Sequence, residues 1–237
     1  MDFRNLHSWP RSEDEAVSIQ NEMRPLIAIG DSLDGVKLIA GVDTAFDHVA
    51  NVLYAAVVLF RYPDLEECEK VSDFADACFP YIPGLHAFRE GPVILKAFRR
   101  LKTKPDLIIF AGHGMAHPRF CGMAGHLGLL LETPSIGCAR RRLAGQYQEP
   151  DPQKGASSPL YVENREVGRV YRSRNNVKPI YISPGYRCSL TEAVRYVTDC
   201  LQGYRVPEPL RAAHRLANRT RRGRSPFPQE GDDDDDE

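Results

Sequence analysis

The stretch Leu38-Ile-Ala-Gly-Val-Asp-Thr-Ala-Phe46 is an apolar run that contains a single carboxylate, Asp43. A short apolar run of this kind predicts a buried β-strand. Two further strands are predicted directly after it, at residues 51–60 and 67–78. Because the three segments are close in sequence, we expect them to form an antiparallel meander.

Helices and a parallel strand are predicted on either side of this meander. Ser12, followed by Glu15 three residues later, is a capping box and predicts a helix over residues 13–23. Helical spacing of apolar residues predicts another helix over residues 91–101. The apolar run Asp-Leu-Ile-Ile-Phe at 106–110 is typical of a central parallel strand.

The second half of the chain continues to alternate between helices and strands. We expect an exposed loop at 150–159, a helix near 127, strands at 135–138 and 180–183, a hairpin over 160–171, and helices over 189–201 and 207–219. This order predicts one α/β domain over residues 1–224, with a mixed sheet flanked by helices. The RNase H-like architecture has this pattern.

Composition limits the class of protein. A chain of 237 residues with 42% hydrophobic content can bury one sizeable core. It contains no apolar stretch of about 18 residues, and its N-terminus lacks a secretory pattern. Its six cysteines occur singly, without the paired spacing of a zinc site. We therefore expect a reduced, cytoplasmic protein without a membrane segment.

Charge is distributed unevenly along the chain. The segment 225–237 holds seven acids, and we expect it to be a disordered tail. Without these acids the formal net charge changes from -1 to about +6. Arginines cluster at 140–142 and 211–224, and such clusters attract phosphate. A solvated surface is the alternative interpretation of the same clusters.

Two acids lie where a metal-dependent nuclease would need them. Phosphodiester hydrolysis uses carboxylates that converge on one or two hard cations. Asp43 lies inside an apolar strand, and Glu90 lies where a proline-rich loop meets a helix. Taken alone, Asp43 could instead form a structural ion pair, and Glu90 could instead favour the start of a helix. The predicted parallel strand ends in Ala111-Gly112-His113-Gly114, without a carboxylate.

A series of motifs in order resembles the endonuclease V family over residues 12–222. The series is Gly41-Val42-Asp43, Pro80-Tyr81-Ile82-Pro83-Gly84, Phe88-Arg89-Glu90-Gly91-Pro92, Gly112-His113-Gly114, His117-Pro118-Arg119, Pro134-Ser135-Ile136-Gly137, Ser183-Pro184-Gly185 and Pro207-Glu208-Pro209. The tyrosine loop followed by Phe-Arg-Glu is the most specific part.

The resemblance implies an RNase H-like fold and nicking that depends on Mg²⁺ or Mn²⁺. The family cuts the second phosphodiester bond on the 3′ side of hypoxanthine, which is deaminated adenine, and leaves a 3′-hydroxyl and a 5′-phosphate. By motif position, Asp43 and Glu90 match metal-binding catalytic acids. His214 matches a histidine near the metal, and a surface helix histidine is the alternative for it.

The resemblance also implies how substrate is bound. Tyr81 lies in the family's wedge loop, which parts the strands, and a flipped base is read by backbone groups around glycine turns. The implied substrate-binding residues are Tyr81, Pro83, Gly84, Gly112, Gly114, His117, Gly122, Gly137 and Arg140. The implied partner is DNA with deaminated bases, with RNA as the alternative, and the implied assembly is a monomer.

Four positions depart from the family pattern. The family normally has Asp where this chain has Ala111 and Lys where it has Arg140. It usually has His in place of Tyr186 and Ser in place of Gly125. Loss of the aspartate removes a metal ligand, so we expect impaired cutting. Two alternatives remain open: a non-catalytic homologue that binds deaminated or distorted nucleic acid, and an RNase H-like nuclease with a different substrate. Four changes together fit natural divergence better than a single engineered knock-out does.

Overall fold

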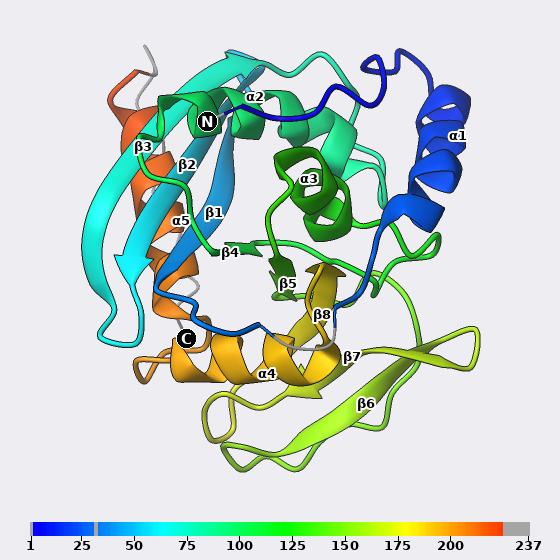
Figure 1. The fold of residues 1–237 in the computed structure, drawn as a ribbon, viewed down its shortest axis with the longest axis vertical. Coiled ribbons are helices and arrows are strands. Elements are labelled where there is room, and N and C mark those ends of the chain that lie inside the picture. Colours follow the sequence, from blue (N-terminus) through cyan, green and yellow to red (C-terminus); the bar gives the residue numbers. More distant parts are fainter. Residues whose placement is uncertain (1, 31–32, 225–237) are drawn as a thin grey trace.

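The computed structural model describes residues 2–30 and 33–224, which form a mixed sheet with helices on both faces (Figure 1). The sheet has eight strands in the order β3-β2-β1-β4-β5-β8-β7-β6. The strands are β1 (Leu38–Asp47), β2 (Val52–Arg61), β3 (Glu66–Asp76), β4 (Leu107–Phe110), β5 (Ser135–Ala139), β6 (Ser157–Val162), β7 (Arg165–Tyr171) and β8 (Ile180–Tyr186). The helices are α1 (Glu13–Met23), α2 (His86–Arg100), α3 (Met123–Leu131), α4 (Leu190–Asp199) and α5 (Glu208–Arg222), with a 3-10 turn at Arg24–Leu26. The expected tail at 225–237 lies outside the described residues.

The strand pairings confirm the predicted mixed sheet. β1, β2 and β3 form the expected antiparallel meander. β4 runs parallel to β1 on one side and to β5 on the other, so it is the central parallel strand that its apolar run predicts. β8 then returns antiparallel to β5, and the β6–β7 hairpin extends the sheet.

Two helices begin earlier than the sequence pattern predicts. α2 begins at His86 and keeps Pro92 inside it, because its first turns already bury Ala87 and Phe88. α3 begins at Met123 rather than near Leu127. By contrast, α1 has the predicted bounds, and the Ser12 hydroxyl accepts the backbone N–H of Glu15 at 3.3 Å.

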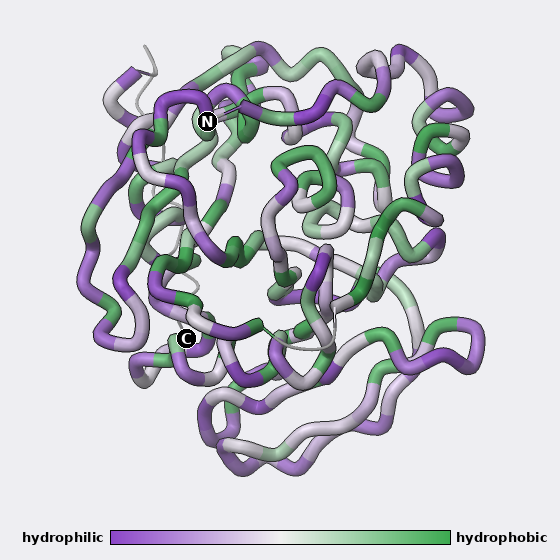
Figure 2. Tube along the Cα trace, viewed as in Figure 1, coloured by the Kyte–Doolittle hydropathy of each residue, from purple (hydrophilic) through white to green (hydrophobic). Residues whose placement is uncertain are grey.

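The core lies on both faces of the sheet. On one face, Phe98 of α2 and Leu127 of α3 pack with Val42. On the other, Tyr196 of α4 and Leu210 of α5 pack with Ile39. Figure 2 shows that hydrophobic residues concentrate in and around α3, whereas the tip of the β6–β7 hairpin is hydrophilic. Alternate residues of β1 therefore face opposite helix layers.

Helix α5 packs unusually close to β1. A Cβ atom on Gly41 would lie 2.0 Å from the carbonyl oxygen of Pro209, near the start of α5. Only a glycine leaves room for this approach. The contact brings the middle of α5, and with it His214, next to Asp43.

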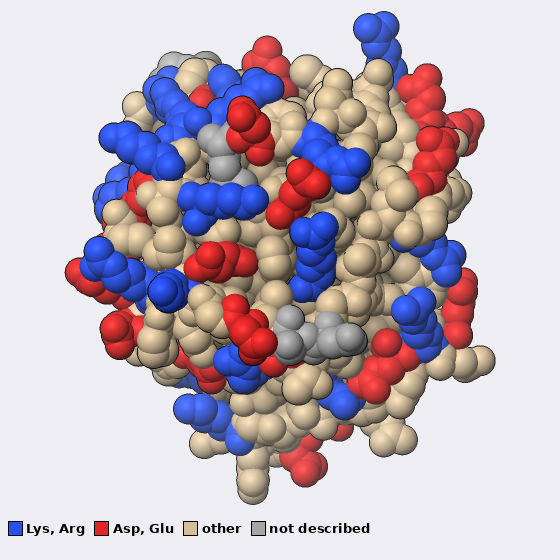
Figure 3. All heavy atoms as spheres, viewed as in Figure 1, with Lys and Arg blue, Asp and Glu red and all other residues tan. Residues whose placement is uncertain are grey.

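The visible surface carries both signs of charge. In Figure 3, Lys and Arg side chains gather over the region of β3 and α2, with acidic side chains interspersed. Within that region Lys96 and Arg100 contact the buried carboxylate of Asp73 at 3.0 and 3.3 Å. None of the described helices is long and apolar enough to cross a membrane.

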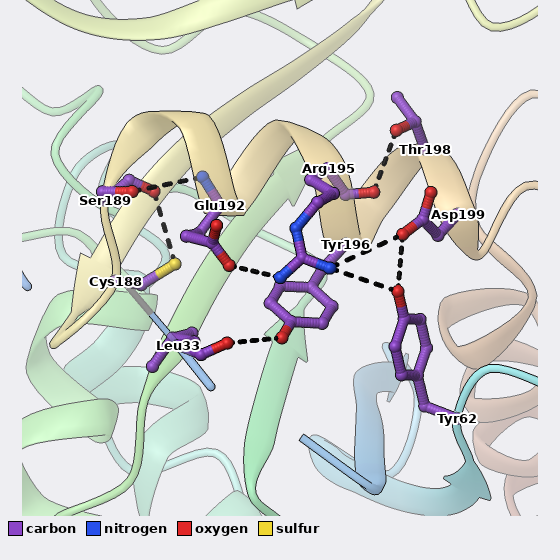
Figure 4. Close-up of polar contacts among 9 residues, drawn as sticks. All are labelled: Leu33, Tyr62, Cys188, Ser189, Glu192, Arg195, Tyr196, Thr198 and Asp199. Atoms are coloured by element: carbon purple, nitrogen blue, oxygen red, sulfur yellow. Dashed lines mark hydrogen bonds and ion pairs between the residues drawn. The ribbon is translucent and has the colours of Figure 1, made fainter. Parts of the chain in front are cut away.

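Helix α4 is tied to the turn after β2 by a polar network (Figure 4). The Tyr62 hydroxyl donates to Asp199 Oδ2 at 2.6 Å. Burial, with this hydrogen bond as a further cause, raises the pKa of Tyr62 to about 12. Arg195 donates to Glu192 Oε2 at 2.5 Å on the same helix. This network is structural, and it holds α4 against the sheet.

Candidate active site at the end of β4

The candidate site lies where β4 ends and β1 continues. Phe110, the last residue of β4, pairs with Val42. The backbone N–H of Ala111 then donates to the Val42 carbonyl at 2.9 Å, which ends the parallel pairing. Asp43 and Thr44 follow on β1, beside the space that β4 leaves. This is the end of a parallel strand at which sites in α/β sheets commonly form.

Thr44 connects the two predicted catalytic acids. Its backbone N–H donates to Asp43 Oδ1 at 2.8 Å, and its hydroxyl donates to Glu90 Oε2 at 2.8 Å. Asp43 and Thr44 point to opposite layers of the sheet, but both lie at its open end. The fold thus brings Asp43 of β1 and Glu90 of α2 to one place.

The environment of Glu90 favours its protonated form. Glu90 keeps partial solvent exposure as a residue, yet protein atoms crowd its carboxyl group. Desolvation is the main cause that raises its pKa to about 7, and the negative charge of Asp43 adds to it. The Thr44 hydrogen bond and Arg89 act in the opposite direction. A cation placed between the two acids would reverse this balance.

His214 of α5 orients Asp43. Its Nδ1 lies 2.9 Å from Asp43 Oδ2, and its Nε2 lies 3.0 Å from the side-chain nitrogen of Asn218. An amide NH₂ group donates, so Nε2 is the acceptor and Nδ1 carries the hydrogen that goes to Asp43. His214 thus acts on Asp43 through a hydrogen bond, with Asn218 fixing its tautomer.

Asp43 and Glu90 can hold one divalent cation, but together they provide only two carboxylate ligands. Mg²⁺ prefers oxygen ligands, keeps several waters, and is often held by one or two carboxylates. Asp43 and Glu90 provide that minimum. Within the described part of the chain, no group of three or more His, Cys, Asp or Glu side chains is arranged to hold a metal. Ala111, at the position where the resemblance implies a carboxylate, adds no ligand.

A cleft opens beside these acids. It consists of two hollows of about 350 and 50 Å³ that share His86, Ala111, Gly112 and His113 as lining residues. The larger hollow contains Asp43, His214 and Arg140. The smaller hollow contains Glu90 together with Gly84, His117 and Gly122. Most of the predicted site residues therefore line one continuous cleft, although their assigned roles stay predictions.

His117 fixes one wall of the smaller hollow. Its Nε2 lies 2.7 Å from the carbonyl oxygen of Gly84, and Gln20 donates to the same oxygen at 2.8 Å. Burial lowers the pKa of His117 to about 4, so the ring is neutral at pH 7. Gly84 has φ of +84°, a conformation that favours glycine. Within this fold, His117 positions the Gly84 turn.

The tyrosine loop stands at the mouth of the cleft. Tyr81 is 68% exposed, and its ring centroid lies 4.8 Å from that of His86, which lines both hollows. Pro83 is exposed next to it. An exposed aromatic ring beside a cleft suits a role in contacting bases, and that role stays a prediction.

Two of the predicted glycines have a packing role. A Cβ on Gly114 would lie 2.0 Å from the Pro184 carbonyl oxygen, and one on Gly137 would lie 2.4 Å from the Gly114 nitrogen. Neither is among the described residues that line the two hollows. They let the turn after β4 pack against β5 and β8, so a direct contact with a base stays a prediction for both.

The four departures from the family pattern fall in two places. Ala111 and Arg140 line the larger hollow. Tyr186 is buried in the core beside α3, and Gly125 lies within α3 itself. The first pair shares a hollow with Asp43, whereas the second pair lies in the core in and around α3.

The sequence did not assign a site role to Thr44, Asn218 or His86, and it gave His113 only as part of the Gly112-His113-Gly114 motif. Thr44 directly follows Asp43, so strand alternation predicts that it points away from it. Asn218 lies one helical turn after His214, and that spacing was an available signal for it. His86 was not assigned to the site because the helix predicted over residues 91–101 was expected to begin after it.

Comparison with known proteins agrees with this geometry. A family model described as Endonuclease V matches residues 21–215. Endonuclease V of Dehalococcoides mccartyi (strain ATCC BAA-2100 / JCM 16839 / KCTC 5957 / BAV1) is 44% identical over 215 residues, which cover 91% of this chain and 96% of that protein. The crystal structure of endonuclease V from Streptomyces avermitilis has a TM-score of 0.85 and 35% identity, covering 94% of this chain and 99% of that one.

A solved complex is also similar. Ciona intestinalis endonuclease V, bound to a 24mer DNA containing an inosine followed by a ribo-adenosine, has a TM-score of 0.79 and 25% identity. The match covers 90% of this chain and 98% of that one. These likenesses confirm the expected RNase H-like fold.

Proposed function

This chain belongs to the endonuclease V family, and we propose that it nicks the second phosphodiester bond on the 3′ side of hypoxanthine in DNA, with Mg²⁺ or Mn²⁺ as cofactor and with reduced turnover. The observation that carries the proposal is the pairing of Asp43 and Glu90 through Thr44 at the open end of β4. The cleft beside them provides a place for a base.

Asp43 and Glu90 would hold the cation. A divalent ion bound there supplies positive charge that activates water and stabilises the leaving oxygen. The protein's own part is to orient the acids: Thr44 contacts both, and His214 contacts Asp43. Arg140, which lines the larger hollow, would attract the substrate phosphate.

The glycine-walled part of the cleft would take a flipped base. Enzymes that act beside a damaged base commonly move it out of the stack into such a pocket. Gly84, Gly112 and Gly122 line the smaller hollow, where the absence of side chains exposes backbone groups. Tyr81, exposed at the mouth, would stack on bases that are opened when the nucleotide leaves the helix.

The reduced turnover follows from Ala111. Its side chain lines both hollows but offers no ligand, so a bound cation would have only two protein carboxylates. Even the loss of groups that merely orient metal ligands costs roughly 10–100-fold in affinity or activity. We expect the loss of a ligand to cost at least as much.

The test is a nicking assay on one duplex with a single hypoxanthine, in Mg²⁺ and in Mn²⁺, using the natural chain and Ala111→Asp. We expect slow, site-specific nicking by the natural chain and an increase of at least about tenfold for Ala111→Asp. An Asp43→Asn variant is the inactive control. Absence of any nicking by Ala111→Asp would contradict the proposed function.

A second candidate is a homologue that binds but does not cut. The combination of an intact cleft with a missing carboxylate favours it. Binding of the hypoxanthine duplex without nicking by the natural chain, in either metal, would support this candidate. The same assay with an RNA substrate would show whether DNA or RNA is preferred.

A further inference from the structure

The side chain of His113 is held in one tautomer. Its Nε2 lies 2.9 Å from the carbonyl oxygen of Arg141, and a carbonyl oxygen only accepts hydrogen bonds. Nε2 therefore carries a hydrogen. Burial lowers the pKa of His113 to about 4, so the ring is neutral at pH 7 and its Nδ1 carries an unshared electron pair.

That electron pair has no partner in the described part of the protein. Nδ1 of His113 is buried and makes no hydrogen bond there. The ring lines both hollows of the cleft, at the point where the acids and the glycine walls meet. A buried acceptor without a donor is uncommon in folded proteins and calls for an explanation.

The acceptor is also held rigidly. The His113 backbone carbonyl accepts the N–H of Ala124 in the first turn of α3 at 3.0 Å, while the ring is held by Arg141. Gly122 permits this arrangement, because a Cβ there would lie 2.3 Å from the His113 carbonyl oxygen. Both ends of the residue are thus fixed before any ligand arrives, which suits recognition.

We propose that Nδ1 of His113 accepts the ring N–H of a deaminated base, so that His113 is a side-chain specificity determinant. This inference rests on the proposed function. Deamination of adenine replaces the amino group by a carbonyl and places a hydrogen on ring atom N1, and deamination of cytosine does the same at N3. Adenine and cytosine present an electron pair at that atom instead, which would face the electron pair of Nδ1.

The inferred selection is limited by its chemistry. Guanine also carries a hydrogen on N1, so this acceptor rejects adenine and cytosine but not guanine. Discrimination against adenine and cytosine is strong, because either base would leave two acceptors facing each other without a hydrogen between them. The substrate class is therefore a base with a ring N–H beside an exocyclic carbonyl.

His48 provides a matched control outside the cleft. It is exposed in the turn after β1 and is not among the described residues that line the two hollows. A leucine at position 48 repeats the histidine-to-leucine change while leaving the cleft wall and the His113 acceptor in place.

The experiment measures binding of two single-stranded oligonucleotides that differ only in hypoxanthine or adenine at one position. Fluorescence anisotropy gives both dissociation constants in Ca²⁺, and a gel checks that the oligonucleotides remain intact. The proteins are the natural chain, His113→Leu, His113→Asn and His48→Leu, each compared by thermal unfolding. Single strands avoid differences in the cost of opening a base pair.

We expect the natural chain to bind the hypoxanthine oligonucleotide more tightly than the adenine one. In His113→Leu the ratio of the two dissociation constants should fall about tenfold. His113→Asn should retain part of it, because its amide oxygen can lie near the position of Nδ1. His48→Leu, outside the cleft, should keep the natural preference. A folded His113→Leu protein with the natural preference would overturn the role of His113 alone, whereas a natural chain without preference would overturn both this role and the proposed function.

Discussion

His214 Nδ1 lies 2.9 Å from Asp43 Oδ2, so a residue of the last helix orients an acid on the first strand. The contact depends on Asn218, which holds the other ring nitrogen at 3.0 Å. Neither His214 nor Asn218 is a carboxylate, yet both determine where the Asp43 oxygens point. The site is thus built from segments at opposite ends of the sequence.

Substitution of His214 should slow nicking without unfolding the protein. His214→Ala removes the donor to Asp43 Oδ2, so that among the described residues Asp43 keeps only the Thr44 N–H as a donor. We expect turnover to fall roughly 10–100-fold, measured in Mg²⁺ on the hypoxanthine duplex. The Ala111→Asp protein serves as the background if the natural chain is too slow to time.

Asn218→Ala is the companion variant, because it leaves the imidazole in place but frees its tautomer. Its effect on turnover should be in the same direction and smaller. Equal turnover for His214→Ala and the unchanged protein would argue against an orienting role for the histidine.

The raised pKa of Glu90 should make the metal-free protein less stable at high pH. Its pKa rises from an ordinary 4.5 to about 7 in the fold. Between these values the folded state binds more protons than the unfolded state, so the free energy of unfolding falls as pH rises. We expect a loss of about 1–3 kcal/mol between pH 4.5 and 8, allowing for the partial exposure of the residue.

Urea unfolding in EDTA at several pH values measures this dependence. Glu90→Gln is neutral throughout and should remove most of the change in that window. Added Mg²⁺ should oppose the change, because a bound cation favours the charged carboxylate. A Glu90→Gln protein that shows the full pH dependence would assign it to other groups.

Tyr81 should contribute to nucleic-acid binding and little to stability. Its side chain is 68% exposed, so Tyr81→Ala should alter the free energy of unfolding by less than about 0.5 kcal/mol. Loss of a stacking ring should weaken binding to an opened duplex by about 1–3 kcal/mol. Anisotropy on a hypoxanthine duplex measures the effect.

Tyr161→Ala is the matched control for Tyr81. Tyr161 is 42% exposed on the β6–β7 hairpin and lies outside the linings of the two hollows. The Tyr161→Ala variant should bind the duplex as tightly as the unchanged protein does. Equal weakening by both substitutions would remove the special role of the tyrosine loop.

The sequence predicts the fold better than it predicts the contacts within the site. Hydrophobic runs specify β1 and β4 because burial of their side chains drives strand formation, and their pairing then brings Asp43 to the open end of β4. The hydrogen bonds of Thr44 depend on where α2 lies in space. No local pattern encodes that placement, so its link to Glu90 could not be predicted.

The start of α2 shows the same limit. Pro92 favours an interpretation in which the helix begins near it, because proline suits the first turn of a helix. Burial of Phe88 outweighs that local preference and extends the helix back to His86. The extension places a second imidazole in the cleft, which local pattern alone did not reveal.

Gly41 should be intolerant of even a methyl group, because α5 lies directly on it. A Cβ at this position would lie 2.0 Å from the Pro209 carbonyl oxygen, which is backbone and cannot rotate away. Gly41→Ala must therefore push α5 from β1, at a cost of about 3 kcal/mol in the free energy of unfolding. Because the same helix carries His214, nicking should fall even at temperatures where the variant stays folded.

Gly223→Ala is the control for Gly41→Ala. Gly223 is exposed at the end of α5, and a Cβ there would lie 3.4 Å from its nearest neighbour. Thermal unfolding and the nicking assay measure both effects, and a Gly41→Ala protein as stable as Gly223→Ala would show that α5 does not need this close approach to position His214.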